Sequence, residues 1–233
     1  VNKAGLARGC LIQQPDHFED LIHLEDTYWW HVAKRQLATR LLQSRFPAPG
    51  RLVEGGVGSA RNLLEFQALG YEVTGFDVMA EVVDHAKQRG LNDVRQHDLS
   101  EPWPLEADSV RAVVLLDVLE HMDDPVQVLR NASTVLQPGG GVIITVPAYP
   151  LLYSNWDERL GHRRRYTSRV LRSQAVESGL KVERITHWNS FTLPAACVVR
   201  GMDRVFGRDA GSQFPRVSPT VNSLLLGCAS MER

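Results

Sequence analysis

The stretch RLVEGGVGSARNLLEF, residues 51–66, decides the fold of this 233-residue chain. A short apolar run precedes three glycines, and a segment of helical character follows them. This order of strand, glycine turn and helix is typical of the first turn of an open α/β sheet, where ligands bind beyond the carboxyl ends of the strands. The acid Glu54 stands directly before the glycines, so the ligand of this turn must tolerate a neighbouring carboxylate.

Predicted strands and helices alternate from Arg51 onward. We expect strands at 51–55, 71–77, 93–98, 110–117, 141–148 and 180–188, and helices at 59–70, 78–90, 123–140 and 167–179. Strands separated by single helices form βαβ units and therefore a mainly parallel sheet. The runs AVVLL and VIITV are apolar throughout, as strands buried on both faces are. The sequence predicts an α/β fold, a Rossmann-like doubly wound sheet with helices on both faces.

Helix boundaries are marked by local signals. Pro125 follows two aspartates at one predicted helix start, and Thr167 is a candidate cap with Gly179 closing the next helix.

Three regions are expected along the chain. Residues 1–50 form an N-terminal helical cap, because apolar side chains recur there at helical spacing. Residues 51–187 form the ligand-binding core. Residues 188–233 form a C-terminal helical extension, with helices at 191–207 and 221–233 on either side of a loop, and serve as an acceptor or dimer region.

Composition excludes several classes of function. The 26 basic and 27 acidic residues give a net charge of −1, which does not favour bulk binding to nucleic acid. The three cysteines, Cys10, Cys197 and Cys228, lie far apart, so neither a disulfide framework nor a metal site is expected. Without an apolar run of about 18 residues or a signal-peptide pattern, we expect no membrane span and a cytoplasmic protein.

The glycine turn fits neither common phosphate-binding motif. A dinucleotide fingerprint needs a third glycine where this chain has Arg61, and a P-loop needs a lysine that is missing here. A carboxylate at Glu54 would repel a pyrophosphate, but it suits a cationic ligand. S-adenosylmethionine carries an ammonium and a sulfonium and no phosphate, so the turn favours this cofactor over NAD.

Acids also follow the next two predicted strands. Asp77 lies 19 residues beyond Gly58, where a carboxylate can accept both hydroxyls of a ribose, and Asp98 is placed to accept from an adenine amino group. Any one of these acids alone would be an ordinary turn residue, but together they indicate a nucleoside ligand.

Five segments of the sequence resemble motifs of a known protein family. LVEGGVGSA, GFD, HDL, LLDVLEHMDDP and LQPGGGVIITVP resemble successive motifs of class I S-adenosylmethionine-dependent methyltransferases. They are most similar to the small-molecule branch that has a Leu-Glu-His segment after strand four. The resemblance covers residues 50–187, and YWWHVAKR and GHRRRYT also resemble segments of bacterial members with unassigned substrates. The fold of that family ends with a seventh, antiparallel strand, and we expect either that SLLLGCAS forms it or that the chain stops before it.

The resemblance implies roles for individual residues. Glu54, Gly56 and Gly58 would hold the methionine end of the cofactor, and Asp77 its ribose. The adenine would lie against Phe76 or Val78 and near Asp98 and Leu99, and Asp117 would line the methyl-donor site. The complete predicted cofactor site comprises Trp30, Arg35, Glu54, Gly55, Gly56, Val57, Gly58, Phe76, Asp77, Val78, His97, Asp98, Leu99 and Asp117. Ala60 in place of the third glycine and Gly55 in place of an aliphatic residue depart from the family pattern.

Two histidines are the candidate catalytic residues. Methyl transfer from a sulfonium needs alignment of the acceptor, and a hydroxyl acceptor also needs a base. His121 follows strand four at the mouth of the site, as a base or as a residue that packs the loop, and Glu120 is expected to be structural. His162 follows strand five at the same edge, and we expect His162 and Tyr166 to face the pocket.

Two further segments have open interpretations. Arg163, Arg164 and Arg165 are either a clamp for an anionic acceptor or a solvated basic run. Trp29 and Trp30 are adjacent, so we expect one in the core and the other over the site, as a lid or as purely structural residues. Arg35 could reach a carboxylate.

The leading hypothesis is methyl transfer to a small or medium-sized acceptor, most simply at oxygen. The acceptor could be anionic or lipid-linked, and the protein could form a homodimer. The alternatives are an NAD(P)-dependent oxidoreductase and a non-catalytic methyltransferase-like subunit. The segment DVLE after strand four counts against methylation of nucleic-acid bases.

Overall fold

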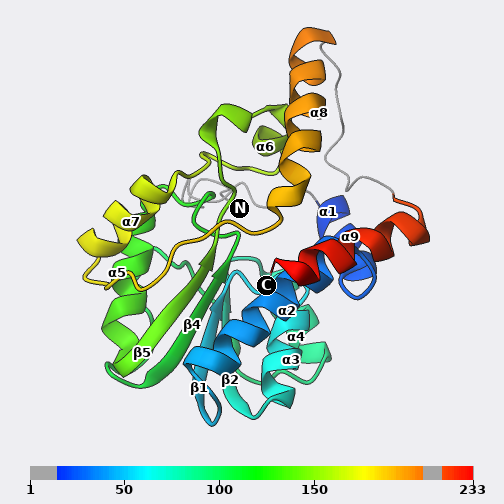
Figure 1. Ribbon diagram of the computed structural model, residues 1–233. Helices are drawn as coiled ribbons and strands as arrows, with labels where there is room; N and C mark the ends of the chain where they lie inside the picture. Colours follow the sequence, from blue (N-terminus) through cyan, green and yellow to red (C-terminus); the bar gives the residue numbers. More distant parts are fainter. Residues whose placement is uncertain (1–14, 207–216, 233) are drawn as a thin grey trace, which may run out of the picture.

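The computed structural model describes residues 15–206 and 217–232 and contains a single parallel sheet with helices on both faces (Figure 1). The strand order is β3-β2-β1-β4-β5, and every pairing is parallel. The strands are β1 (Gly50–Gly55), β2 (Tyr71–Asp77), β3 (Val94–Gln96), β4 (Val110–Leu116) and β5 (Leu136–Thr145). The predicted Rossmann-like fold is confirmed. The order reverses between β1 and β4, which places a ligand crevice at their carboxyl ends.

Nine α-helices and two short 3-10 helices are assigned in the described residues. They are α1 (Pro15–Leu24), α2 (Trp29–Arg45), α3 (Arg61–Ala68), α4 (Ala80–Gln88), α5 (Pro125–Val135), η1 (Pro150–Leu152), α6 (Asn155–Arg159), α7 (Ser168–Glu177), η2 (Ser190–Thr192), α8 (Leu193–Phe206) and α9 (Pro219–Met231).

Two apolar cores hold these helices to the sheet. Alternate residues of β4 point to opposite faces, so Val114 belongs to the core shared with α2, α3 and α4, whereas Val113 belongs to the core shared with α5. Strands buried on both sides explain why these segments are apolar throughout.

The predicted helix signals are confirmed at α5 and α7. The Asp124 side chain accepts from the Gln127 N–H at 3.1 Å, and Pro125 occupies the first turn of α5. The Thr167 hydroxyl accepts from the Val170 N–H at 3.2 Å, and Gly179 ends the helical region with φ at +87°.

The predicted strand at 180–188 is wrong, because no strand is assigned to this segment. After Val182 its apolar side chains, Ile185 and Trp188, are spaced by three residues, so neither face of a strand would be apolar. The strand candidate SLLLGCAS is helical and lies within α9, as the alternative helical prediction for this segment expected. The loop predicted between the last two helices falls mostly outside the described residues.

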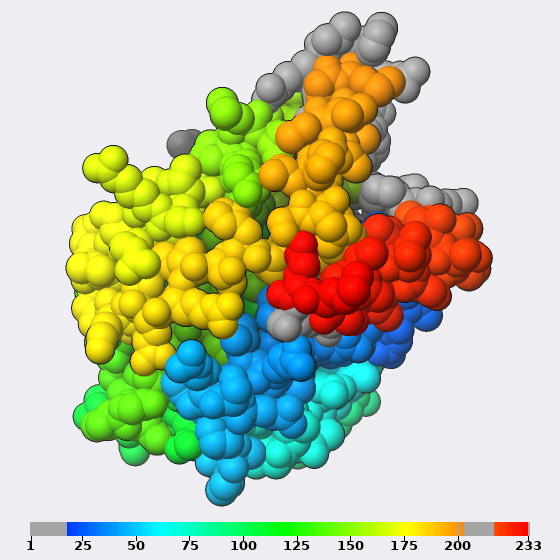
Figure 2. Space-filling view, in the orientation of Figure 1, coloured from blue at the N-terminus to red at the C-terminus, as the bar shows by residue number. Residues whose placement is uncertain are grey.

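The helices near the two chain ends lie together. α9 packs against α2, and the Asn222 side chain connects them by accepting from the Trp29 N–H and donating to the Thr27 carbonyl, both at 2.9 Å. In Figures 1 and 2, α9 lies beside α2, while α8 projects from the body of the molecule. No helix in the described ranges is long and apolar enough to cross a membrane.

Candidate active site

A cavity of about 740 Å³ opens at the carboxyl ends of the strands. Its walls come from the glycine turn after β1, the segments that follow β2, β3, β4 and β5, and helices α1, α2 and α8. The crevice that the strand order creates is therefore covered by the N-terminal and C-terminal helices.

The glycine turn approaches the cavity with its backbone. Gly56 and Gly58 have φ values of +74° and +55°, and a Cβ at Gly56 would come within 2.8 Å of the Val118 side chain. Ala60, which replaces the family's third glycine, is also left-handed with φ at +65° and is fully buried. The turn thus keeps its glycine-like geometry, and α3 begins at Arg61.

Glu54 lies beneath this turn rather than on the cavity surface. It is 1% exposed, and its Oε1 accepts from the Asn62 side chain at 2.8 Å. Burial raises the pKa of Glu54 to about 8, although the hydrogen bond from Asn62 opposes this shift. Asn62 itself lines the cavity. Asn62 therefore connects the Glu54 carboxyl group to the cavity lining.

Asp77 lines the cavity and also braces the glycine turn. Its carboxylate accepts from the Gly58 N–H at 3.3 Å and the Met79 N–H at 3.0 Å. Burial raises its pKa in spite of these hydrogen bonds. An acceptor at this position, with backbone donors around it, suits the predicted ribose contact.

The other predicted cofactor residues divide into two groups. The cavity lining contains Trp30, Arg35, Gly56, Val57, Gly58, Asp77, Val78, His97, Asp98, Leu99 and Asp117. Glu54, Gly55 and Phe76 lie outside this lining. Phe76 is fully buried and packs against the rings of His97 and Trp103, with centroids 5.1 and 5.5 Å away.

The tryptophans of α2 cover the cavity together. Trp29 is buried and Trp30 is half-buried, but both line the cavity, so the expectation that only one would face it is wrong. The ring of Trp29 lies 6.1 Å from that of Phe191, and the ring of Trp30 lies 5.1 Å from that of Trp188. The indoles thus connect α2 to residues 188–191, the segment that precedes α8.

Arg35 is bonded to the N-terminal segment of the chain itself, and its predicted contact with the cofactor stays a prediction. It pairs with Asp26 at 3.1 Å and donates to the Glu25 carbonyl at 2.8 Å.

Lys34 is a site residue that the sequence analysis missed. Its ammonium pairs with Asp117 at 2.8 Å across the cavity wall. Burial alone would raise the pKa of Asp117, but the pair with Lys34 and the hydrogen bond from Thr145 outweigh it and lower that pKa. The signal was present, because Lys34 lies four residues after Trp30 and therefore on the same helix face.

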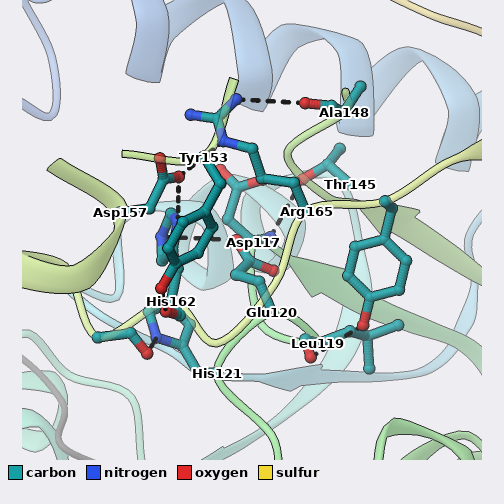
Figure 3. A network of polar contacts seen from close by, with 12 residues as sticks. Asp117, Leu119, Glu120, His121, Thr145, Ala148, Tyr153, Asp157, His162 and Arg165 are labelled. Carbon is teal, nitrogen blue, oxygen red and sulfur yellow. Dashed lines mark hydrogen bonds and ion pairs between the residues drawn. The ribbon is translucent and has the colours of Figure 1, made fainter. Parts of the chain in front are cut away.

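Glu120, His121 and His162 form a cluster at the cavity wall (Figure 3). The imidazole rings of the two histidines lie 4.8 Å apart and edge to face, and His162 Nε2 is 3.9 Å from Glu120 Oε1. Glu120 is completely buried, and burial together with the neighbouring Asp117 raises its pKa well above the usual range. The structure thus brings the two predicted catalytic histidines together.

Asp157 and Arg165 support this cluster. Asp157 is fully buried, its Oδ1 lies 3.1 Å from His162 Nδ1, and it pairs with Arg165 at 2.8 Å. Asp157 is also the third residue of α6, where it completes a capping box with Ser154. No sequence motif marked this residue, because its role depends on a loop that folds back onto α6.

The arginine run braces loops rather than forming an open clamp. Arg163 pairs with Asp123, Arg164 donates to the Met122 carbonyl at 2.9 Å, and only Arg165 of the three lines the cavity. Tyr166 is buried and donates to the Leu119 carbonyl at 3.0 Å, so the expectation that it faces the pocket is wrong.

Comparison with known proteins identifies the family. The model of the methyltransferase domain family matches residues 29–185. The chain therefore belongs to this methyltransferase family, as the resemblance predicted.

Among curated proteins, a ubiquinone biosynthesis O-methyltransferase from Xanthomonas axonopodis pv. citri is 29% identical over 104 residues. The alignment covers 42% of this chain and 44% of that protein, so the chain spans less than half the length of this relative.

Solved structures show the same fold at low sequence identity. An S-adenosylmethionine-dependent methyltransferase from Thermotoga maritima is 20% identical with a TM-score of 0.59, covering 72% of this chain and 78% of that chain. The [4+2]-cyclase SpnF is 19% identical with a TM-score of 0.62, covering 93% and 85%. Because a protein described as a cyclase shares this fold, the fold alone does not define the reaction.

Proposed function

We propose that this protein transfers a methyl group from S-adenosylmethionine to a hydroxyl oxygen of a small or medium-sized acceptor. The observation that carries the proposal is that one cavity joins the turn after β1, the acids after β2 and β4, and the histidine cluster. Cofactor groups and acceptor groups thus share one enclosed space, as an in-line transfer requires. Membership of the methyltransferase family supports the same reaction.

The residues fit this cofactor. Left-handed Gly56 and Gly58 leave room for close approach of a ligand, and the Oε2 atom of buried Glu54 has no hydrogen-bond partner in the described part of the chain. When bound, S-adenosylmethionine supplies an electrophilic methyl group. Asp77 would hold the ribose, and Asp98 and Leu99 would contact the adenine.

The charges favour S-adenosylmethionine over a pyrophosphate cofactor. Within the described residues, each lysine or arginine side chain that lines the cavity is paired with a carboxylate, as in Lys34–Asp117 and Arg165–Asp157. A pyrophosphate would have to compete with these carboxylates and would lie near Asp77. A ligand with a net positive charge meets neither difficulty.

An oxygen acceptor is favoured by the cluster of Glu120, His121 and His162. A hydroxyl must lose its proton during transfer, and this cluster lies at the cavity wall where such a proton can be removed. The curated relative is itself named as an O-methyltransferase. The wall continues along α8 through Leu193, Ala196 and Val199, which favours an acceptor with an apolar part.

Calorimetric titration tests the proposed cofactor. We expect S-adenosylmethionine to bind and NAD not to bind. Asp77→Asn should weaken S-adenosylmethionine binding by about 1.5–3 kcal/mol, or roughly ten- to hundredfold, because a hydrogen-bonded charge is lost. Asp93→Asn is the matched control, since Asp93 pairs with Arg95 and Thr74 outside the cavity lining.

Activity is measured by tritium transfer from methyl-labelled S-adenosylmethionine to a panel of phenols and hydroxy acids. Binding of NAD alone would overturn the cofactor proposal. Tritium incorporation only into amines or thiols would overturn the oxygen acceptor.

A further inference from the structure

The carboxyl group of Glu120 is buried without a hydrogen-bond partner in the described residues. Its side chain is 0% exposed, and neither oxygen has such a partner within the part of the chain that the structure describes. An unpartnered polar group in a protein interior is costly, and in native proteins such a group often binds an ion or a water molecule. Glu120 is nevertheless one of the residues that line the cavity, so an ion bound to it would lie at the cavity wall.

One nitrogen atom of each histidine lies near the Glu120 carboxylate. The ligand atoms of Glu120, His121 and His162 all lie within 4.8 Å of one another. An ion with bonds of about 2.1 Å in tetrahedral geometry holds its ligand atoms about 3.4 Å apart. His162 Nε2 and Glu120 Oε1 are 3.9 Å apart and would approach by about half an ångström, and the most widely separated pair by up to about 1.4 Å. Side-chain rotation alone can provide a movement of this size.

The tautomers of both rings are set by oxygen acceptors. His162 Nδ1 lies 3.1 Å from Asp157 Oδ1, and His121 Nδ1 lies 3.3 Å from the Gly161 carbonyl oxygen. A carbonyl or carboxylate can only accept, so each Nδ1 carries a proton, and in the neutral ring each Nε2 then carries the lone pair. Metal-binding histidines characteristically donate their second nitrogen in this way.

The surrounding charge favours a cation. Three carboxylates gather here, those of Asp117, Glu120 and Asp157, and two of them are balanced by Lys34 and Arg165. Figure 3 shows Glu120 between the histidines and Asp117, with Arg165 directed toward Asp157. Glu120 is the one of the three without a lysine or arginine paired to it in the described residues, so a bound cation would take the place of such a partner.

We propose that Glu120, His121 and His162 bind one divalent first-row transition-metal ion, with an open coordination position toward the cavity. Two imidazoles and one carboxylate suit ions such as Zn²⁺ or Co²⁺ better than Mg²⁺, which prefers oxygen ligands. The site comes from two distant segments, because Glu120 and His121 follow β4 whereas His162 follows α6.

The metal gives the cluster a role in the reaction, and this part rests on the proposed function. A hydroxyl at the open position has a lowered pKa, as a zinc-bound water does. Its O–H bond breaks and the proton passes to solvent. The oxygen then forms the bond to the methyl carbon while the methyl–sulfur bond breaks, which leaves a neutral thioether.

Co²⁺ is the probe for the site. The full chain is stripped with a chelator and titrated with Co²⁺ while its visible absorption is recorded, and bound metal is measured after dialysis. We expect one equivalent of Co²⁺, displaced by Zn²⁺ but not by an equal concentration of Mg²⁺. Glu120→Gln and His162→Ala should each weaken binding by more than roughly a hundredfold, beyond the effect of losing an outer partner.

His187→Ala is the matched control, because His187 also lines the cavity but stacks on Tyr149 away from the cluster. The metal site is overturned if no equivalent binds or if both cluster variants bind as the wild type does. Equal displacement by Mg²⁺ would overturn the metal class.

Titration with S-adenosylmethionine separates the two proposals. Glu120→Gln preserves the side-chain shape, and retained cofactor binding in this variant would show that it is folded. Metal binding without cofactor binding in the wild type would overturn the proposed function and leave the metal site standing. Cofactor binding without metal binding in the wild type would overturn the metal site and leave the proposed function standing.

Discussion

At the residue scale, Glu54 shows how burial in the fold changes the surroundings and the ionisation of an acidic side chain. Its place before the glycines suggested a carboxylate facing the ligand, but it is buried beneath the turn and bonded to Asn62. A carboxyl in such surroundings retains its proton up to about pH 8. In the absence of a cationic ligand, Glu54 is therefore mostly neutral at pH 7.

The raised pKa of Glu54 predicts a pH-dependent stability. Between the ordinary pKa of 4.5 and the folded value of about 8, the unfolded chain loses this proton while the folded chain keeps it. The free energy of unfolding should therefore fall by about 1.4 kcal/mol per pH unit in this window, owing to this group. Glu54→Gln should remove that part of the decline, measured by urea unfolding at pH 5, 6, 7 and 8.

The comparison isolates Glu54, because Glu120, whose pKa is also raised, is present in both proteins. Parallel pH profiles for wild type and variant would show that Glu54 ionises normally in the folded protein.

At the element scale, the helix boundaries follow local chemistry more closely than the strands do. The caps at Asp124 and Thr167 and the glycine after α7 fall where the sequence indicated. The segment 180–188 has β-branched and aromatic residues, yet it does not pair with β5. A strand needs a sheet edge to pair with and one apolar face, and the segment 180–188 has no apolar face.

Thr167→Ala should reduce the free energy of unfolding by about 1 kcal/mol. The substitution removes the hydroxyl that accepts from the Val170 N–H at the start of α7. Urea unfolding measures the change.

Ser168→Ala is the neighbouring control, since Ser168 lies inside the helix start and does not cap it. An equal loss in both variants would contradict a capping role for Thr167.

At the scale of the whole molecule, the cavity depends on contact between the two ends of the chain. α2 supplies Trp29, Trp30 and Lys34 to its wall, and α9 holds α2 from the other side through Asn222. The regions 1–50 and 188–233 were expected as separate additions to the core. Their described helices instead form one cover, because α2 packs against α9 and both α2 and α8 line the cavity.

Asn222→Ala should loosen this cover. The variant removes the hydrogen bonds to the Trp29 N–H, which is part-buried, and to the exposed Thr27 carbonyl, at a cost of about 1 kcal/mol. We expect faster amide hydrogen exchange in α9 and at the start of α2, measured by mass spectrometry.

Ser223→Ala, at an exposed position on the same helix, should leave exchange unchanged. The Asn222 connection would be unimportant if its variant exchanged at the wild-type rate in both helices.

The sequence by itself determined the alternation of strands and helices, the glycine turn and the acids at the strand ends. These features depend on residue periodicity and turn chemistry within a few neighbouring positions, and both can be recognised in the sequence alone. It also supplied His121 and His162 as separate candidates. What it lacked was their relation to each other and to Glu120.

Only the tertiary structure decided which distant residues meet. Lys34 pairs with Asp117 across 83 positions, and His162 reaches Glu120 because the loop after α6 returns to the end of β4. The order of the strands and the packing of α2 against α9 bring these residues together. No local pattern encodes such contacts, because their free energy depends on burial that exists only once the sheet and its covering helices are assembled.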